Sequence, residues 1–348
     1  MVKIVVKRKK NGQMITLSFV ALFAVLWILM GFNLDNPDYM FYENLFYRVE
    51  SGITTVSVEG GFLFLVKIAV GIGINYQIFL ICYSAFGLIL ICSSIIKYTK
   101  KPSFVLIAYF CYPFLLDLTQ LRHFMAVAIF VFSIRYLKEY NAKNLIKYCA
   151  LILIAASQQI LALSFLVYLL VYMNNSKRAI RIAVVLTIFN LVGFKYILKS
   201  SLVEKIFSLR GKEVNYVGGY SIGQVIMYGM FFGVLLVLCY ILYRNDMNKD
   251  KSYDFIFKIC MYSSIFIPFI MIDFQYTRLF RASIIIIYIY ISNQISKLNK
   301  RDMFIWQGFF LVFMILIWIK LFGPGSGYFE EITCPVFQSN SILNGILN

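Results

Sequence analysis

Residues 113–130 read Pro-Phe-Leu-Leu-Asp-Leu-Thr-Gln-Leu-Arg-His-Phe-Met-Ala-Val-Ala-Ile-Phe. One apolar segment ends near Asp117 and the next begins at once, with Arg122 and the chain's only histidine, His123, just inside it. Asp117 and Gln120 have the spacing of a helix N-cap and its N3 partner. An arginine close to a helix N-terminus adds full charge to an end that already carries about half a positive charge, which suits an anion such as phosphate. Charge at this depth in a membrane is costly and is usually kept for function, so we expect a site here.

The chain as a whole is too apolar for a water-soluble domain. Its 348 residues are 61% hydrophobic and 14% charged, and the mean hydropathy is +0.79. Apolar runs suited to crossing a bilayer recur between short polar stretches. We therefore predict an all-α polytopic membrane protein, with one integral membrane domain over residues 1–348. The predicted spans are 13–31, 76–96, 103–117, 119–137, 144–157, 160–173, 179–194, 222–243, 255–272, 279–296 and 303–321, eleven in all.

Lys and Arg divide unevenly between the two sides of this topology. With a cytoplasmic N-terminus, the inner segments hold 22 of the 33 Lys and Arg and five of the 16 Asp and Glu. They therefore carry the whole net charge of +17, in agreement with the positive-inside rule. This assigns the charge to topology and to anionic headgroups of the membrane lipids, and the short, scattered basic runs argue against nucleic-acid binding. The inner segments are 1–12, 97–102, 135–147, 174–181, 244–258 and 297–302.

The N-terminus and the cysteines have simple interpretations. The basic residues up to Lys10 precede an apolar run without a small-residue cleavage site, so we predict an uncleaved first span. The seven cysteines show neither CxxC nor Cys/His spacing, so no metal centre or disulfide framework is predicted. No cofactor is predicted.

Three polar regions are predicted outside the membrane. Residues 32–75 form a first outer loop with a short amphipathic helix at 61–72, rich in carboxylates and tyrosines; it is either a solvated loop with an aromatic belt or a rim that binds sugar. Residues 195–221 have helical periodicity and predict an amphipathic segment that lies on the membrane and gates or caps the site. The C-terminal tail, 322–348, is predicted outside and loosely ordered, because it begins Gly323-Pro-Gly-Ser-Gly.

Two predicted helix pairs, 103–117/119–137 and 144–157/160–173, are unusually short. Each uses about 30–35 residues for two crossings that ordinarily need about 40. We expect such re-entrant-like pairs to end below the surface, so that their outer turns form the floor of a depression. The polar residues that map to those turns are Asp117, Gln120, Arg122, His123, Ser157, Gln158 and Gln159.

A second stretch is similar to the first. Residues 268–278 and residues 113–122 both contain Pro-Phe, an apolar step, an Asp and, five residues later, an Arg. Arg122 and Arg278 then begin two helices on the same side, with Arg281 one turn further. The alternative for each arginine is an ion pair with its local Asp or a position among the headgroups.

Four short motifs follow one another along the chain: Asp38, Tyr39 and Tyr42 (Asp-Tyr-x-x-Tyr); Glu59, Gly61 and Phe62 (Glu-x-Gly-Phe); Gln120 to Arg122 (Gln-Leu-Arg); and Tyr276 and Arg278 (Tyr-x-Arg). In order and topology they resemble the EpsG-like, Wzy-type bacterial polysaccharide polymerases of O-antigen, capsule and exopolysaccharide synthesis, over roughly residues 35–285. The resemblance implies a GT-C-like glycosyltransferase that joins undecaprenyl-pyrophosphate-linked oligosaccharides at the outer face of the cytoplasmic (inner) membrane. It also implies flippase and chain-length regulator proteins as partners. Such relatives often have a histidine where this chain has Gln158-Gln159, so either His123 takes its role or the histidine is not essential.

The chemistry of that reaction defines the candidate residues. Arg122 and Arg278 are suited to hold a pyrophosphate leaving group without a metal ion. His123, Asp38 and Glu59 are the candidate bases for the attacking hydroxyl, and the choice among them stays open. The predicted substrate-binding residues are Arg278, Arg281, Asp117, Gln120, Gln158, Gln159, Tyr39, Tyr42 and Tyr276. The carboxylates of Asp35, Asp38 and Glu59 leave a metal-dependent alternative open.

Three rival functions remain at this stage. One is a ligase or other glycosyltransferase with the same donor and a different acceptor. Another is a transporter or flippase of lipid-linked oligosaccharide, although transporters usually place charge near the bilayer midplane, whereas here the charge lies at the outer turns. The last is a structural scaffold, which would have no chemical need for Arg122.

Overall fold

The computed structural model describes residues 5–8, 14–53, 58–173, 175–198, 222–246, 253–271 and 274–347. Within these ranges the chain is almost wholly helical, with one short antiparallel pair near the N-terminus, β1 (Val5–Arg8) and β2 (Met14–Thr16). The first helices are α1 (Leu17–Gly31), α2 (Tyr39–Glu50), α3 (Gly60–Gly71), α4 (Tyr76–Tyr98), α5 (Pro102–Tyr109), η1 (Phe110–Phe114), α6 (Leu115–Thr119), α7 (Leu121–Ser133), η2 (Ile134–Tyr136), α8 (Ala142–Gln158), η3 (Ile160–Leu169) and α9 (Leu170–Met173). They are followed by α10 (Ser176–Leu198), α12 (Ile222–Asn245), α13 (Asp254–Tyr262), η5 (Ser263–Met271), η6 (Phe274–Tyr276), α14 (Thr277–Arg281), α15 (Ile284–Ile295), α16 (Lys300–Phe322), η7 (Phe329–Thr333), α17 (Cys334–Gln338) and α18 (Ser341–Leu347).

The predicted apolar segments are helices in the structure, with boundaries that differ by a few residues. The first span begins at Leu17 instead of residue 13, because Thr16 accepts a hydrogen bond from Phe19 N and caps the helix while its own strand pairs with β1. Five stretches in the described part of the chain have the length and apolarity to cross a membrane: Tyr76–Tyr98, Pro102–Thr119, Ile222–Asn245, Asp254–Met271 and Lys300–Phe322. The protein is therefore a helical, polytopic membrane protein. The count of eleven spans and the GT-C-like architecture stay predictions.

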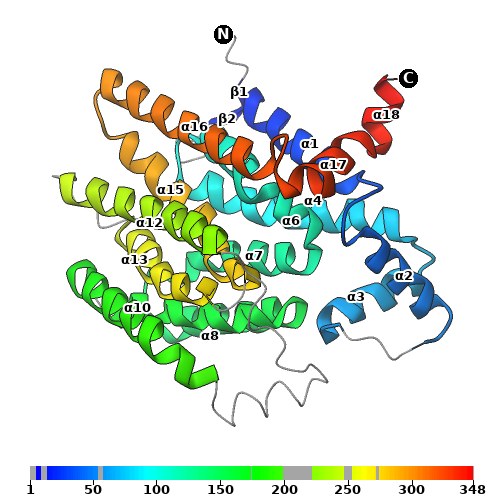
Figure 1. The fold of residues 1–348 in the computed structure, drawn as a ribbon, viewed down its shortest axis with the longest axis horizontal. Helices are drawn as coiled ribbons and strands as arrows, with labels where there is room; N and C mark the ends of the chain where they lie inside the picture. Colours follow the sequence, from blue (N-terminus) through cyan, green and yellow to red (C-terminus); the bar gives the residue numbers. More distant parts are fainter. Residues whose placement is uncertain are drawn as a thin grey trace.

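The centre of the bundle is formed by α15 and α7. All twelve residues of α15 are buried, including the run of four isoleucines with which it begins. A helix that is apolar on every side is stable only where neighbours surround it, and α15 packs against α5, α12, α13 and α16. α12 and α16 bury only a minority of their residues, as expected for helices that face lipid. In Figure 1 the long helices run along the horizontal axis, with α16 at the upper edge and α10 at the lower edge.

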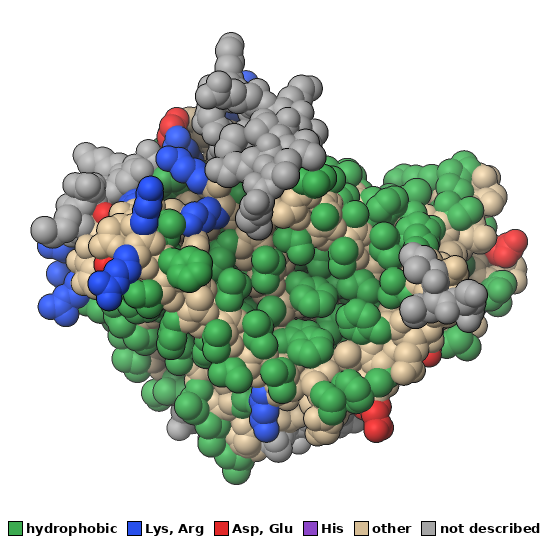
Figure 2. Space-filling view, turned by 90° about the horizontal axis from the view of Figure 1, so that it is seen from above, with side chains coloured by type: hydrophobic (Ala, Val, Ile, Leu, Met, Phe, Trp, Pro, Cys, Tyr) green, Lys and Arg blue, Asp and Glu red, His purple; other side chains and the backbone are tan. Residues whose placement is uncertain are grey.

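The segments predicted to be cytoplasmic meet at one end of the bundle. Lys297 Nζ lies 2.6 Å from Asp246 Oδ2, and Asn293 Nδ2 donates to the Tyr98 carbonyl at 2.5 Å. Figure 2 shows Lys and Arg side chains gathered at the left end of the molecule, with apolar side chains across the middle. The predicted inner segments 97–102, 244–258 and 297–302 thus share one end, although its position in the cytoplasm stays a prediction.

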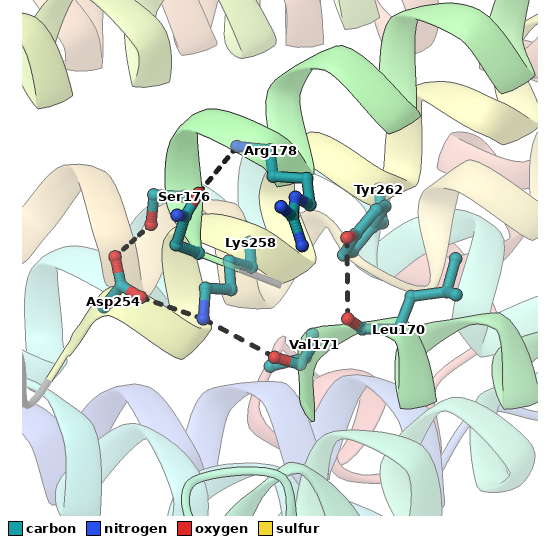
Figure 3. A network of polar contacts seen from close by, with 8 residues as sticks. Leu170, Val171, Ser176, Arg178, Asp254, Lys258 and Tyr262 are labelled. Carbon is teal, nitrogen blue, oxygen red and sulfur yellow. Dashed lines mark hydrogen bonds and ion pairs between the residues drawn. The ribbon is translucent and has the colours of Figure 1, made fainter. Parts of the chain in front are cut away.

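Figure 3 shows a second set of contacts that joins these segments. The Asp254 carboxylate accepts from Ser176 Oγ and lies 3.0 Å from Lys258 Nζ, which also donates to the Val171 carbonyl at 3.5 Å. The start of α13 is thereby tied to the end of α9 and the start of α10. The contacts fix the connections at this end of the bundle.

The opposite end carries α2, α3 and the C-terminal helices (Figure 1). The expectation of a loosely ordered tail is wrong, because residues 329–347 are helical apart from two residues and pack on the rest of the protein. Asn340 is fully buried, and its side chain donates to the Ile28 carbonyl at the end of α1 at 2.9 Å. The predicted amphipathic segment at 195–221 lies outside the described residues beyond Leu198, where α10 ends.

Candidate active site

The helix break at Gln120 positions the first arginine of the site. α6 ends at Thr119, and Gln120 departs from helical geometry, with φ −104° and ψ 64°, before α7 begins. Arg122 therefore lies in the first turn of α7, near the positive end of the helix dipole. The predicted N-cap role of Asp117 is wrong: Asp117 lies inside α6, because the chain stays helical for two more residues and the Asp117 carboxylate binds other side chains.

Arg122 joins three segments that are distant in sequence. Its Nη1 forms an ion pair with Glu59 Oε2, and Glu59 Oε1 accepts from the backbone N–H of Ile160, where η3 begins, at 3.3 Å. Its Cζ lies 5.9 Å from the ring centroid of Phe41 in α2, at cation–π distance. The Arg122 side chain remains 23% exposed. The partner of Arg122 is thus Glu59, and not the nearby Asp117.

Close packing between α3 and α8 holds Glu59 in place. A Cβ atom added to Gly61 would lie 2.1 Å from Ser157 Oγ and 2.8 Å from the Ser157 carbonyl oxygen. Only glycine allows the first turn of α3 to approach the end of α8 so closely. Since Glu59 is the residue before α3, this contact sets its distance from Arg122.

We expect Gly61→Ala to separate α3 from α8 and to disturb the ion pair of Glu59 with Arg122. Overpacking of this kind costs about 1–3 kcal/mol, so the variant should unfold at lower temperature in detergent. The matched control is Gly60→Ala, because a Cβ there would meet nothing within 4 Å. Equal melting temperatures for the two variants would show that the close contact does not determine the position of α3.

A second arginine, Arg281, is enclosed in a buried network. Arg281 Nε lies 3.3 Å from Asp117 Oδ1, and the two side chains are 2% and 1% exposed. Arg281 Nη2 donates to Gln120 Oε1 at 2.5 Å, and Tyr109 OH donates to Asp117 Oδ2 at 3.0 Å. The network connects α14 to α5, α6 and the break before α7. It therefore fixes the position of the third arginine, Arg278, which lies one turn before Arg281.

Arg278 has no ion-pair partner among the described residues. It lies in the short helix α14 and is partly exposed, and Asp273 of its own motif lies outside those residues. Its charge interacts over a longer range with Arg281, Asp38 and Arg122. Arg278 is thus within electrostatic range of both Arg281 and Arg122, each of which is paired with a carboxylate; we call these three residues the arginine cluster.

Asp38 is a carboxylate whose charge interacts with two of these arginines, Arg278 and Arg122. It occupies the N-cap position of α2, and Asn36 Oδ1 accepts from its backbone N–H at 3.0 Å. Burial raises the pKa of Asp38 above its ordinary value of 3.8, while the positive charges of Arg278 and then Arg122 act in the opposite direction. Asp38 thus lies within electrostatic range of Arg278 and Arg122, and its role at the site stays a prediction.

The comparison with known families gives a match over most of the chain. The model of the EpsG family matches residues 16–331. The chain belongs to the EpsG family. This is a family of Wzy-like polysaccharide polymerases, and the match covers α1 to η7, including every residue of the arginine cluster. No curated protein and no solved structure matches the chain.

In this EpsG-family protein, His123 follows Arg122 in α7 and is buried. Its side chain is 3% exposed, and its Nε2 has no hydrogen-bond partner among the described residues. The charges of Arg281 and Arg278 both act on it. A histidine that is enclosed within the protein has little access to a substrate hydroxyl.

The two glutamines lie at the second helix break. Gln158 is 5% exposed and accepts a hydrogen bond from Tyr83 OH at 3.0 Å. Gln159 ends α8 in extended geometry, with φ −149° and ψ 114°, beside the Ile160 N–H that binds Glu59. Gln159 thus adjoins the site, whereas the Gln158 side chain is used within the protein.

Three tyrosines, two in α2 and one just before α14, pack within the protein around the site. Tyr42 is 3% exposed and packs with its ring centroid 5.5 Å from that of Phe62, in the first turn of α3. Tyr39 OH donates to Gln77 Oε1 at 3.2 Å. Tyr276 precedes α14 and packs edge-to-face on Phe269 at 6.2 Å. These rings position α2 and α14.

Two features of the site had no clear sign in the sequence. Tyr109 lies in a continuous apolar run, where nothing marks it as the donor to Asp117, and Phe41 is one aromatic residue among several in its loop. Across the described ranges, no group of three His, Cys, Asp or Glu side chains is arranged to hold a metal ion.

Proposed function

We propose that this protein polymerises oligosaccharide repeat units that are carried on undecaprenyl pyrophosphate. The observation that carries the proposal is Arg278, a partly exposed cation without an ion-pair partner among the described residues, whose charge interacts with those of Arg122 and Asp38. Arginine binds phosphate groups bidentately, and two arginines near the starts of α7 and α14 suit the two phosphates of a diphosphate.

The reaction follows from these positions. The bond between the donor sugar's anomeric carbon and the pyrophosphate oxygen breaks, and a hydroxyl oxygen of the acceptor repeat unit forms the new glycosidic bond. Arg278 and Arg122 stabilise the negative charge that develops on the leaving diphosphate. The Asp38 carboxylate accepts the proton of the attacking hydroxyl, and undecaprenyl pyrophosphate is released.

The remaining groups hold this arrangement. Glu59 is held by the hydrogen bond from Ile160 N–H and orients Arg122 through their ion pair. Arg281, paired with Asp117, fixes α14, which also carries Arg278. His123 lies too deep to reach the hydroxyl, so Asp38 is the base we propose. The substrate enters from the lipid at the outer face of the cytoplasmic membrane, with flippase and chain-length regulator proteins as partners.

Activity should fall as the pH is lowered. Burial raises the pKa of Asp38, and the carboxylate accepts a proton only when ionised, so kcat should decline as pH falls through a value above 3.8. Asp38→Glu should keep this acidic limb, and Asp38→Asn should lose most of its activity at every pH and keep only a low residual turnover. A pH–rate profile of the purified enzyme that is the same in wild type and Asp38→Asn would exclude Asp38 as the base.

The function itself is tested with purified protein and undecaprenyl-pyrophosphate-linked repeat units extracted from cells that lack this chain. A polymerase yields a ladder of longer chains on the lipid carrier. A ligase yields single transfers to another acceptor. Movement of the repeat unit across vesicles without new glycosidic bonds would instead identify a transporter, and the proposal would fail.

A further inference from the structure

We propose that the C-terminal tail positions Asp38, with Asn340 as the positioning residue. This inference rests on the proposed function, because it assigns a role to the residue named there as the base. Its physical basis is a continuous chain of hydrogen bonds from residues 339–341 to the N-cap of α2. The tail is separated from Asp38 by most of the sequence.

The first part of the chain is a pairing between the tail and the segment after α1. Leu34 N donates to the Ser339 carbonyl at 2.8 Å, and Ser341 N donates to the Phe32 carbonyl at 3.0 Å. These two bonds frame an antiparallel bridge between Asn33 and Asn340. Both asparagines are completely buried. The pairing therefore holds residues 32–34 by backbone hydrogen bonds that are shielded from water.

The Asn340 side chain completes the attachment. Its Nδ2 donates at 2.9 Å to the Ile28 carbonyl in the last turn of α1, which also accepts from the Phe32 N–H at 3.1 Å. Its Oδ1 accepts from the backbone N–H groups of Ile342 and Leu343, both at 3.2 Å, and caps α18. One side chain thus joins the end of α1 to the start of α18.

The second part of the chain runs from Asn33 to the site. Asn36 Nδ2 donates to Asn33 Oδ1 at 2.8 Å, and Asn36 Oδ1 accepts from Asp38 N at 3.0 Å. This turn fixes the backbone at the residue where α2 begins, and hence the position of the Asp38 carboxylate, whose charge interacts with those of Arg278 and Arg122. Loss of the tail pairing would remove the backbone hydrogen bonds that hold Phe32 and Leu34 on either side of Asn33.

Asn340→Asp separates the two roles of Asn340. Aspartate is a good N-cap, so α18 keeps its cap, but a carboxylate cannot donate to the Ile28 carbonyl. The matched control is Asn344→Asp, the same change one turn later in α18, where the structure gives the side chain no hydrogen bond within the described residues. Amide hydrogen exchange of both variants in lipid nanodiscs should show at least tenfold faster exchange at residues 32–36 in Asn340→Asp only.

The catalytic readout is a double-mutant cycle on the lipid-linked repeat unit. Asn340→Asp should lower kcat about tenfold and leave the donor KM within twofold of wild type. In an Asp38→Asn background, where residual turnover is followed over long incubations, Asn340→Asp should have no further effect, because it acts only through Asp38. A merely structural role would give the same loss in both backgrounds.

The two experiments distinguish failure of this inference from failure of the proposed function. Unchanged amide hydrogen exchange at residues 32–36 in Asn340→Asp would overturn the inference. Faster exchange with an unchanged kcat would also overturn it, as would a loss of kcat that is additive with the loss caused by Asp38→Asn. If the wild type forms no glycosidic bonds, the proposed function fails, and the exchange data still decide whether Asn340 holds the segment that bears Asp38.

Discussion

Arg278→Ala is expected to lower chain formation by a factor of about 10²–10³, the loss that follows removal of one preorganised charge at a developing anion. Arg278 forms no ion pair with the described residues, so its removal leaves none of their carboxylates without an ion-pair partner. The protein should therefore remain folded, and the melting temperature should change little. Ladder formation by the purified variant, normalised to folded protein, measures the effect.

Two further substitutions make the Arg278 result specific. Arg278→Lys keeps the charge but loses the bidentate geometry, so it should recover only part of the activity. Arg301→Ala removes an exposed arginine at the opposite, basic end of the bundle and should leave activity unchanged. Full activity in Arg278→Ala would remove Arg278 from the mechanism.

Asp117→Asn is expected to have the largest effect on stability. The Asp117 and Arg281 side chains are 1% and 2% exposed, so the substitution leaves a buried guanidinium without its counter-charge. Breaking a buried pair by removing one partner costs about 3–5 kcal/mol. Thermal unfolding in detergent should show a clearly lower midpoint, and the purified variant should have little activity because α14 and Arg278 lose their support.

The double variant Asp117→Leu/Arg281→Met distinguishes lost charge balance from lost packing. Replacement of both partners by apolar side chains of similar volume is often close to neutral, so the double variant should recover most of the stability. Arg278 would still lack the contact of Arg281 with Gln120, so we expect activity to stay low. A double variant as unstable as Asp117→Asn would show that the pair is required for packing, not for charge balance.

The sequence predicted the helices well because each is marked by a long apolar run between polar breaks. The breaks at Gln120 and Gln159 were expected from two helix pairs that are too short for two full spans, and the structure has non-helical residues at both positions. The N-cap role of Asp117 failed because the spacing of an Asp and a Gln fits a cap equally well inside a helix, where Arg281 uses the carboxylate instead.

Contacts between distant residues could not be predicted in the same way. The ion pair of Arg122 with Glu59 spans 63 positions, and no periodicity connects the two residues. The tail was expected to be loose because of its glycines, yet Asn340 binds the Ile28 carbonyl 312 positions away. Hydrogen bonds of this kind depend on where the helices end in space, which the local pattern of the sequence does not contain.

Binding of a diphosphate by Arg122 and Arg278 is tested most directly by a lipid-binding measurement. The measurement compares undecaprenyl pyrophosphate with undecaprenyl monophosphate, each titrated against wild type, Arg122→Ala and Arg278→Ala in nanodiscs. We predict that wild type binds the pyrophosphate at least tenfold more tightly than the monophosphate, and that either substitution removes most of this preference. Equal affinity of wild type for the two lipids, or a preference that persists in both variants, would contradict the account.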